Sequence, residues 1–192
     1  MKLLDLIILL SITIALYSFS FGPFSRSKMD VISDKLVVRV SEKICKKYKM
    51  NMVGIGGGAP TGKLDHVTIS FDKNDGPLSI DECRRLMVEC KQAYLDEFNA
   101  SEEIRPFLIT YPFKPGNIDL AFIINYPDGS TILDPDICAV SSYKRGISYS
   151  TCTSLRTPYK STIEEPYEEA LAKLHPQAIL KPDTQIITNF QN

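Results

Sequence analysis

Histidine and closely spaced cysteines are scarce in this sequence, and that scarcity limits its chemistry. Only two histidines occur among 192 residues, His66 and His175, and they are not at the spacing of metal ligands. None of the five cysteines forms a pair separated by two residues, the usual signature of a zinc site. The sequence therefore predicts no metal site and no cofactor. Catalysis by a Cys–His or Ser–His pair would have to use one of the two histidines.

An excess of charge of one sign is also lacking. The 22 basic and 23 acidic residues leave a net charge of −1, which is not the electrostatic footprint of a nucleic-acid-binding protein. Ten glycines and twelve prolines without a regular period exclude a collagen-like or low-complexity chain. With 44% hydrophobic and 23% charged residues, the composition is typical of one globular domain. Nucleic acid is therefore not expected among the partners.

The N-terminus carries a long uncharged stretch that does not belong to the globular core. No charged residue occurs from residue 6 to residue 25, and the first part of this stretch is rich in leucine and isoleucine. We predict that residues 1–22 are a signal peptide or a membrane anchor, which makes the membrane a partner of the chain. Ser18 and Ser20 suit cleavage before Phe21, but an uncleaved anchor fits the stretch equally well.

The charge around the apolar stretch gives two conflicting indications of compartment. Residues 23–50 carry eight basic and three acidic residues, and this excess behind an apolar segment favours the cytoplasm. The short N-terminal tail with Lys2 is instead typical of an exported chain. We favour a membrane-anchored or secreted protein with an extracytoplasmic domain, and a domain facing the cytoplasm remains the alternative.

Hydrophobic periodicity predicts the elements of the first half. Apolar residues recur at spacings of three and four over residues 30–48, so residues 23–49 are predicted to contain a basic juxtamembrane helix packed on the domain. A short apolar strand is expected over residues 52–55, followed by a glycine-rich hairpin loop over residues 56–63. Strict alternation at residues 66–71 then predicts a second strand with one buried face.

The second half begins with the clearest helix of the chain, residues 79–98, where Ser79 and Glu82 form a capping box. The dense apolar run at residues 118–126 predicts a central strand covered on both faces. A helix is expected over residues 165–174.

Together these elements predict an α+β fold. The N-terminal apolar helix precedes a two-layer sandwich, with helices on one face of a mainly antiparallel sheet. We expect residues 50–176 to form the α+β domain and residues 177–192 to be a loosely ordered tail.

The glycine-rich segment has the spacing of a phosphate-binding loop but lacks two of its requirements. Gly57, Gly62 and Lys63 match the pattern GxxxxGK, yet Leu64 stands where a Ser or Thr hydroxyl should bind magnesium. A strand is expected after the loop, whereas phosphate binding needs a following helix N-terminus. We reject this loop as a cofactor site and keep nucleotide binding as a third hypothesis.

Two cysteines are predicted to meet across a hairpin. If residues 144–146 form a three-residue loop symmetrical about Arg145, Cys138 lies directly opposite Cys152. The pair would form a disulfide in an oxidising compartment and remain as two thiols in a reducing one. Cys83 and Cys90 lie seven residues apart on one helix, too far to bridge each other, and are predicted core residues.

These observations leave three functional hypotheses. The first is a non-enzymatic, membrane-associated module that binds another protein or helps to build an envelope structure through its sheet edges and glycine-rich segment. The alternative is a hydrolase or thiol enzyme at the membrane, with His66 as base and Cys138, Cys152 or a loop serine as nucleophile. The third is nucleotide binding between Gly57 and Lys63.

Overall fold

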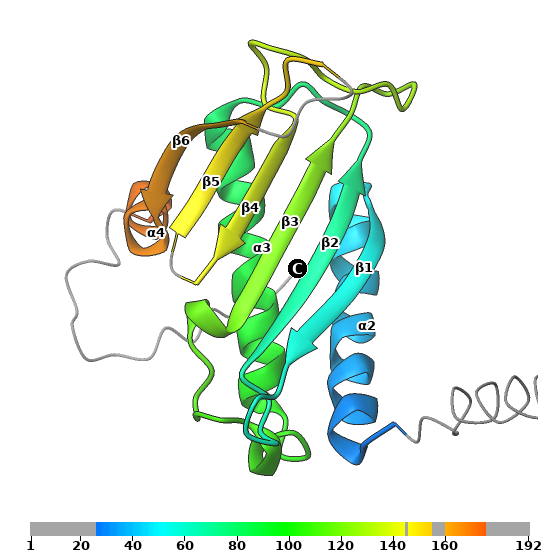
Figure 1. Ribbon diagram of the computed structural model, residues 1–192, viewed down its shortest axis with the longest axis vertical. Coiled ribbons are helices and arrows are strands. Elements are labelled where there is room, and N and C mark those ends of the chain that lie inside the picture. Colours follow the sequence, from blue (N-terminus) through cyan, green and yellow to red (C-terminus); the bar gives the residue numbers. More distant parts are fainter. Residues whose placement is uncertain (1–25, 145, 155–159, 176–192) are drawn as a thin grey trace, which may run out of the picture.

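The computed structural model describes residues 26–144, 146–154 and 160–175, which form a sheet with helices packed against it (Figure 1). The predicted apolar segment, residues 1–22, and the predicted tail, residues 177–192, lie outside the described residues. The helices are α2 (Lys28–Tyr48), α3 (Ile80–Ala100) and α4 (Tyr167–Leu174), with short 3-10 turns η1 (Arg105–Phe107) and η2 (Pro115–Asn117). The strands are β1 (Asn51–Gly58), β2 (His66–Lys73), β3 (Ile118–Ile124), β4 (Ala139–Tyr143), β5 (Gly146–Thr151) and β6 (Lys160–Pro166).

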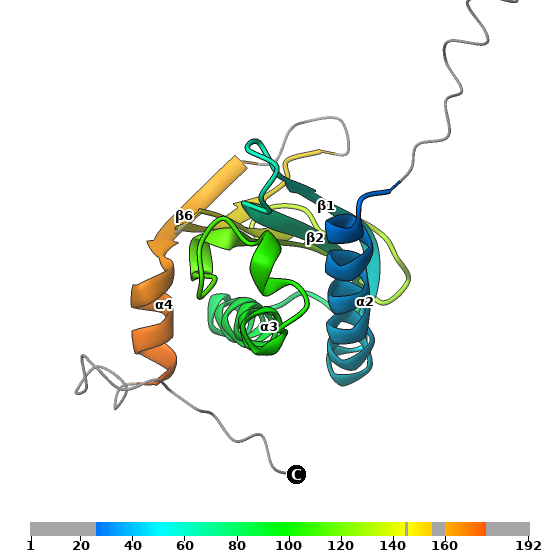
Figure 2. The same cartoon turned by 90° about the horizontal axis from the view of Figure 1, so that it is seen from below.

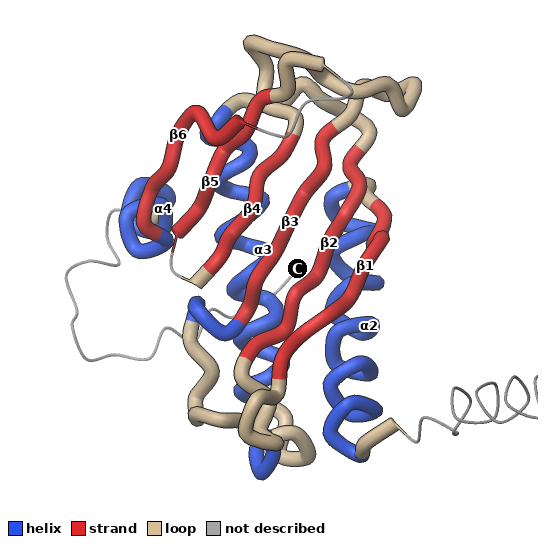
Figure 3. The backbone as a smooth tube through the Cα atoms, viewed as in Figure 1, coloured by secondary structure: helices blue, strands red, loops and turns tan. Residues whose placement is uncertain are grey.

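The six strands lie in the sheet in their chain order, from β1 at one edge to β6 at the other (Figure 3). Every neighbouring pair is antiparallel except β2 and β3, which are parallel. Parallel neighbours require a long crossover connection, and α3 is part of that connection. The prediction of an α+β fold with a mainly antiparallel sheet is confirmed.

The three described helices lie on the same face of the sheet (Figure 2). In β2 the side chains of Val67, Ile69 and Phe71 are buried toward this helical layer, and the residues between them are only half-buried. No described helix covers the opposite face, where small side chains such as Ser70 and Ala121 lie. The apolar core therefore fills the space between one face of the sheet and the helices.

Capping residues fix where the two long helices begin. Ser27 and Asp30 form a capping box at the start of α2, and Ser79 and Glu82 form the predicted one at the start of α3. Each box satisfies backbone N–H groups that have no partner within the helix. Lys49, with φ of 51°, ends α2 in the left-handed conformation and turns the chain into β1.

Three details differ from the sequence-based expectations. The glycines at positions 56–58 belong to β1, so the β1–β2 connection is shorter than predicted. Residue 165 lies in β6, a strand that was not predicted, and the last helix begins only at Tyr167. β3 is central as expected, but Ala121 and Ile123 are only half-buried because no described helix covers that face.

Candidate docking surface at the edge of the sheet

The two edge strands of the described sheet differ in charge. β1 has the sequence NMVGIGGG and carries no charged residue and no proline. β6 carries Lys160, Glu164 and Glu165 and ends with Pro166. Charged residues and prolines on an edge strand discourage pairing with another chain. β6 therefore has the protective features of an edge strand, whereas β1 lacks them.

The residues of β1 are open to contact along its length. Every residue of the strand is exposed or half-buried, and the side chains of Val53 and Ile55 are 52% and 43% exposed. The register with β2 shifts between Met52 and Gly54, so Val53 is an extra residue in the strand. The outer edge of β1 pairs with no other described strand, so its outward backbone groups have no strand partner.

The glycines of β1 do not all serve the same purpose. A Cβ atom at position 57 would lie 2.6 Å from the backbone oxygen of His66, so the chain itself requires glycine there. A Cβ atom at Gly56 would meet nothing within 4 Å, and one at Gly54 would make only ordinary contact with Ser70. Glycine within a strand costs stability and often marks close approach of another backbone or a ligand. No described contact requires glycine at positions 54 and 56.

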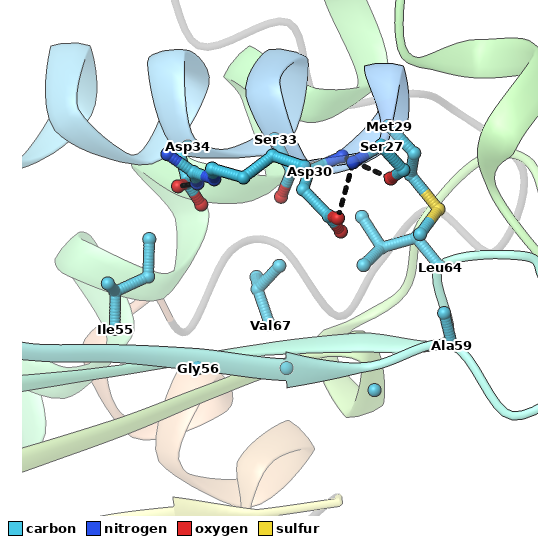
Figure 4. Close-up of a pocket in the computed structure, with 13 residues that line it drawn as sticks. Ser27, Met29, Asp30, Ser33, Asp34, Ile55, Gly56, Ala59, Leu64 and Val67 are labelled. Atoms are coloured by element: carbon cyan, nitrogen blue, oxygen red, sulfur yellow. Dashed lines mark hydrogen bonds and ion pairs between the residues drawn. The ribbon is translucent and has the colours of Figure 1, made fainter. Parts of the chain in front are cut away.

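A groove of about 530 Å³ lies between the N-terminal half of α2 and β1 (Figure 4). Ile55 and Val67 point from the sheet toward the helix and form an apolar floor. Asp30, Ser33 and Asp34 face them from α2. The groove thus combines apolar surface with a few polar groups, as ligand pockets of this size usually do.

The polar side of the groove is held in place by local interactions. Asp30 accepts a hydrogen bond from the backbone N–H of Ser27 and in this way takes part in the capping box. Asp34 forms an ion pair with Arg26, at the first described position of the chain. The cap and the ion pair position these carboxylates beside β1, where they can accept hydrogen bonds from a bound chain.

The groove and the strand edge together suit an extended peptide. A strand added beside β1 would bond to its outward backbone groups, and alternate side chains would point toward the helical layer. There they would meet Ile55 and the groove below α2. The arrangement can recognise backbone through hydrogen bonds and side chains through the apolar floor.

His66, the predicted catalytic base, lies at the start of β2. Its Nδ1 atom is 3.1 Å from Oδ2 of Asp65, and its ring lies against Gly58. Cys138 lies beside the far end of β3, because its carbonyl accepts the N–H of Ile124. Since β2 and β3 run parallel from the same end, about 20 Å of strand separates His66 from this cysteine. The described residues therefore do not bring the predicted base and thiols together.

The residues of the rejected phosphate loop are also separated by the fold. Gly57 is part of β1, whereas Gly62, with φ of +73°, lies in the turn that follows. The ammonium group of Lys63 donates a hydrogen bond to the backbone oxygen of Pro106. No helix follows this turn, because β2 begins at His66.

Cys138 and Cys152 are close together, but their register is not the predicted one. Tyr143 pairs with Gly146, so two residues and not three connect the strands, with Lys144 in the left-handed conformation. This shifts the predicted pairing by one position. Burial and the neighbouring Cys152 thiol raise the pKa of Cys138 to about 11, and the structure holds both residues as thiols. Their closure to a disulfide in an oxidising compartment stays a prediction.

Two buried basic residues of α3 were not found by the sequence analysis. Arg84 donates through Nε to Oε1 of Glu165 at 2.7 Å, and Nζ of Lys173 lies 2.8 Å from Oε2 of the same carboxylate. Burial alone would raise the pKa of Glu165, but the hydrogen bonds from Arg84, Lys173 and Tyr149 outweigh it, and the pKa is lowered. The helical periodicity of α3 could have predicted that Arg84 is buried, because Arg84 lies on the same face as the buried apolar residues.

Lys91 is the second of these residues and is fully buried. Its ammonium group donates to the backbone oxygen of Pro115 at 2.9 Å and lies 5.3 Å from the centre of the Tyr167 ring. Burial lowers the pKa of Lys91 to about 8, although the carboxylates of Asp119 and Glu168 partly oppose this shift. These contacts join α3, η2 and α4, so the residue is part of the packing between helices.

Over the part of the chain that the structure describes, no group of three or more His, Cys, Asp or Glu side chains could hold a metal ion. In the same part, none of the helices combines the length and the apolar character needed to cross a membrane. Comparison with protein-family models, curated proteins and solved structures finds no match for this chain.

Proposed function

We propose that this protein is a non-enzymatic interaction module, held at a membrane by its N-terminal segment, that binds an extended segment of another polypeptide. The observation that carries this proposal is the edge strand β1, which is uncharged, free of proline and open along its length. Strand addition to such an edge supplies affinity through backbone hydrogen bonds. The groove beside it supplies selectivity for side chains.

The membrane association in this proposal comes from the sequence. Residues 1–22 would form an apolar helix that serves either as a signal peptide or as an anchor. The capping box at Ser27 supports this division, because it starts a separate helix only a few residues beyond the apolar segment. The module would then act on the extracytoplasmic side, as part of an envelope structure or as a receptor for another protein.

Site-specific cross-linking in cells tests the proposal. A photoreactive amino acid replaces Val53, an exposed residue of β1, in the full chain. We expect an adduct with an extended segment of a polypeptide, identified by mass spectrometry. Ile55→Lys should lower the adduct yield about tenfold, because a lysine on an edge strand opposes pairing.

The opposite edge provides a matched control. Ile163 of β6 is 41% exposed, close to the 43% of Ile55, so Ile163→Lys adds the same charge to an equally exposed edge position. It should leave the yield unchanged. The proposal fails if position 53 gives no adduct, or if the two lysine variants lower the yield equally.

A further inference from the structure

The sequence itself contains a segment that could pair with the β1 edge. This inference rests on the proposed strand addition. Residues 184–190 have the sequence Thr-Gln-Ile-Ile-Thr-Asn-Phe, with no charge, proline or glycine. Four of these seven residues are β-branched, which favours the extended conformation. A segment of this length and composition is a typical strand-pairing sequence.

The side chains of this segment alternate in a way that suits the groove. In an extended conformation Ile186, Thr188 and Phe190 would lie on one side, and Gln185, Ile187 and Asn189 on the other. Paired with β1, one side of the segment would point toward the apolar floor that includes Ile55. The side with Gln185, Ile187 and Asn189 would point away from the helices, where the sheet face carries no described helix.

The length of chain before this segment argues against insertion into its own molecule. α4 starts beside β6, at the edge of the sheet opposite β1, and runs away from the sheet to end at Leu174 (Figures 1 and 2). The five strand spacings between the edges amount to about 24 Å, and α3 lies between α4 and α2, so a route around a helix adds about 10 Å. The ten Cα-to-Cα steps from Leu174 to Thr184 span at most about 36 Å when fully extended, so insertion into the same molecule would need an almost straight linker.

We propose that residues 184–190 of one copy of this chain add as a strand to the outer edge of β1 in a second copy. The contact is heterologous, because the donor segment and the acceptor edge are different surfaces. Each copy carries one donor and one acceptor, so the contact can repeat from molecule to molecule. The charged β6 edge takes no part in it.

Sedimentation of the full chain in a mild detergent tests this proposal. The wild-type chain should form oligomers that grow with protein concentration. Thr188→Pro should raise the dissociation constant about tenfold or more, since proline removes a backbone donor from the middle of the added strand. Thr188→Val keeps the extended preference and serves as the matched control, with wild-type association expected. Ile55→Lys should weaken association as strongly as the proline variant, and Ile163→Lys should not.

Mixing the two defective variants separates this arrangement from a symmetrical one. The Ile55→Lys variant keeps an intact donor segment, and the Thr188→Pro variant keeps an intact acceptor edge. Their equimolar mixture should therefore form a one-to-one heterodimer at concentrations where each variant alone is monomeric. A contact of β1 with β1 would instead survive Thr188→Pro and would not be restored by mixing.

The outcomes also distinguish this proposal from the one on which it rests. If Ile55→Lys abolishes a cross-link at position 53 but the cross-linked peptide comes from another protein, the edge is a docking site and its donor is not residues 184–190. A wild-type chain that stays monomeric at every concentration, or oligomers that persist in Thr188→Pro, would overturn the tail-to-edge contact. The absence of any adduct that depends on Ile55 would overturn both proposals.

Discussion

The buried charges of α3 determine how single residues respond to pH. Arg84 and Lys91 are seven residues apart and face the same interior as Cys83 and Cys90. Arg84 is balanced by the carboxylates of Glu165 and Asp81, whereas Lys91 donates a hydrogen bond to the backbone carbonyl of Pro115. A buried ammonium group without a directly bonded carboxylate favours the neutral form, and its pKa falls. The fold therefore raises the pKa of Arg84 and lowers the pKa of Lys91.

Lys91→Met should remove a pH-dependent cost to stability. The buried ammonium group lowers the free energy of unfolding while it is charged, and this cost disappears at alkaline pH. The pKa of Lys91 falls from its ordinary value of 10.5 to about 8 on folding, so the unfolded chain binds more protons between these values. Between pH 8 and 10.5 the wild-type free energy of unfolding should rise relative to the variant, by up to about 3 kcal/mol. Urea unfolding of both proteins across this range measures the difference. If the free energies of unfolding of the wild type and the variant changed equally with pH, the ammonium group would not be desolvated.

Glu165→Gln should be destabilising at neutral pH, because it leaves the buried guanidinium of Arg84 with only the exposed carboxylate of Asp81 as a countercharge. Breaking a buried ion pair at one partner costs roughly 3 kcal/mol. The pKa of Glu165 is lowered in the folded chain, so its contribution is present above about pH 4.5 and is lost as the pH falls below that value. Thermal unfolding at neutral and acidic pH should therefore show the variant and the wild type converging in acid. A constant difference would contradict the assigned ion pair.

At the scale of elements, the sequence predicted those helices and strands that a local pattern of residues determines. α3 was predictable because a capping box precedes a strong apolar periodicity, and β2 because its apolar residues alternate strictly. β6 was missed because Ile163 is its single apolar residue apart from the final proline, so no alternation was visible. The groove could not be predicted, because it depends on where α2 lies over β1, and tertiary packing decides that.

The glycines of β1 give a paired prediction for that strand. Gly57→Ala would place a Cβ atom 2.6 Å from the His66 carbonyl oxygen, and the backbone of β2 would have to shift. We expect a loss of about 1–3 kcal/mol. Gly56→Ala meets no atom and should be neutral or stabilising by about 0.5 kcal/mol through a less flexible unfolded chain. Chemical denaturation of the two variants compares them, and equal effects would contradict the different surroundings of the two glycines.

At the scale of the whole molecule, the start of α2 and two loops gather at one end of the sheet. Leu64 of the β1–β2 connection bonds through its backbone to Phe107 and Ile109, which follow α3. Ala59, at the start of the same connection, lines the groove together with Arg26. The apolar segment joins the described fold at this end, through residue 26.

Removal of residues 2–25 should release the protein from membranes without unfolding it. All described elements begin after residue 25, and the cap of α2 is formed by Ser27 and Asp30. We expect the shortened chain in the soluble fraction, with an unchanged melting temperature, and the full chain in the membrane fraction unless it is cleaved before Phe21. Intact mass distinguishes the anchored form from the cleaved one. A shortened chain that still sediments with membranes would contradict the tether.

The unequal edges of the sheet give any row of copies a direction. In the proposed contact the β1 edge accepts a strand, and the β6 edge, with Lys160, Glu164 and Pro166, does not. At one end of such a row the last molecule has a free β1 edge, and at the other end the last molecule has a free donor segment, residues 184–190. A copy that has lost residues 184–192 could join only at the tail-bearing terminus and would halt growth there, so a small proportion of shortened molecules would set the length of the whole array.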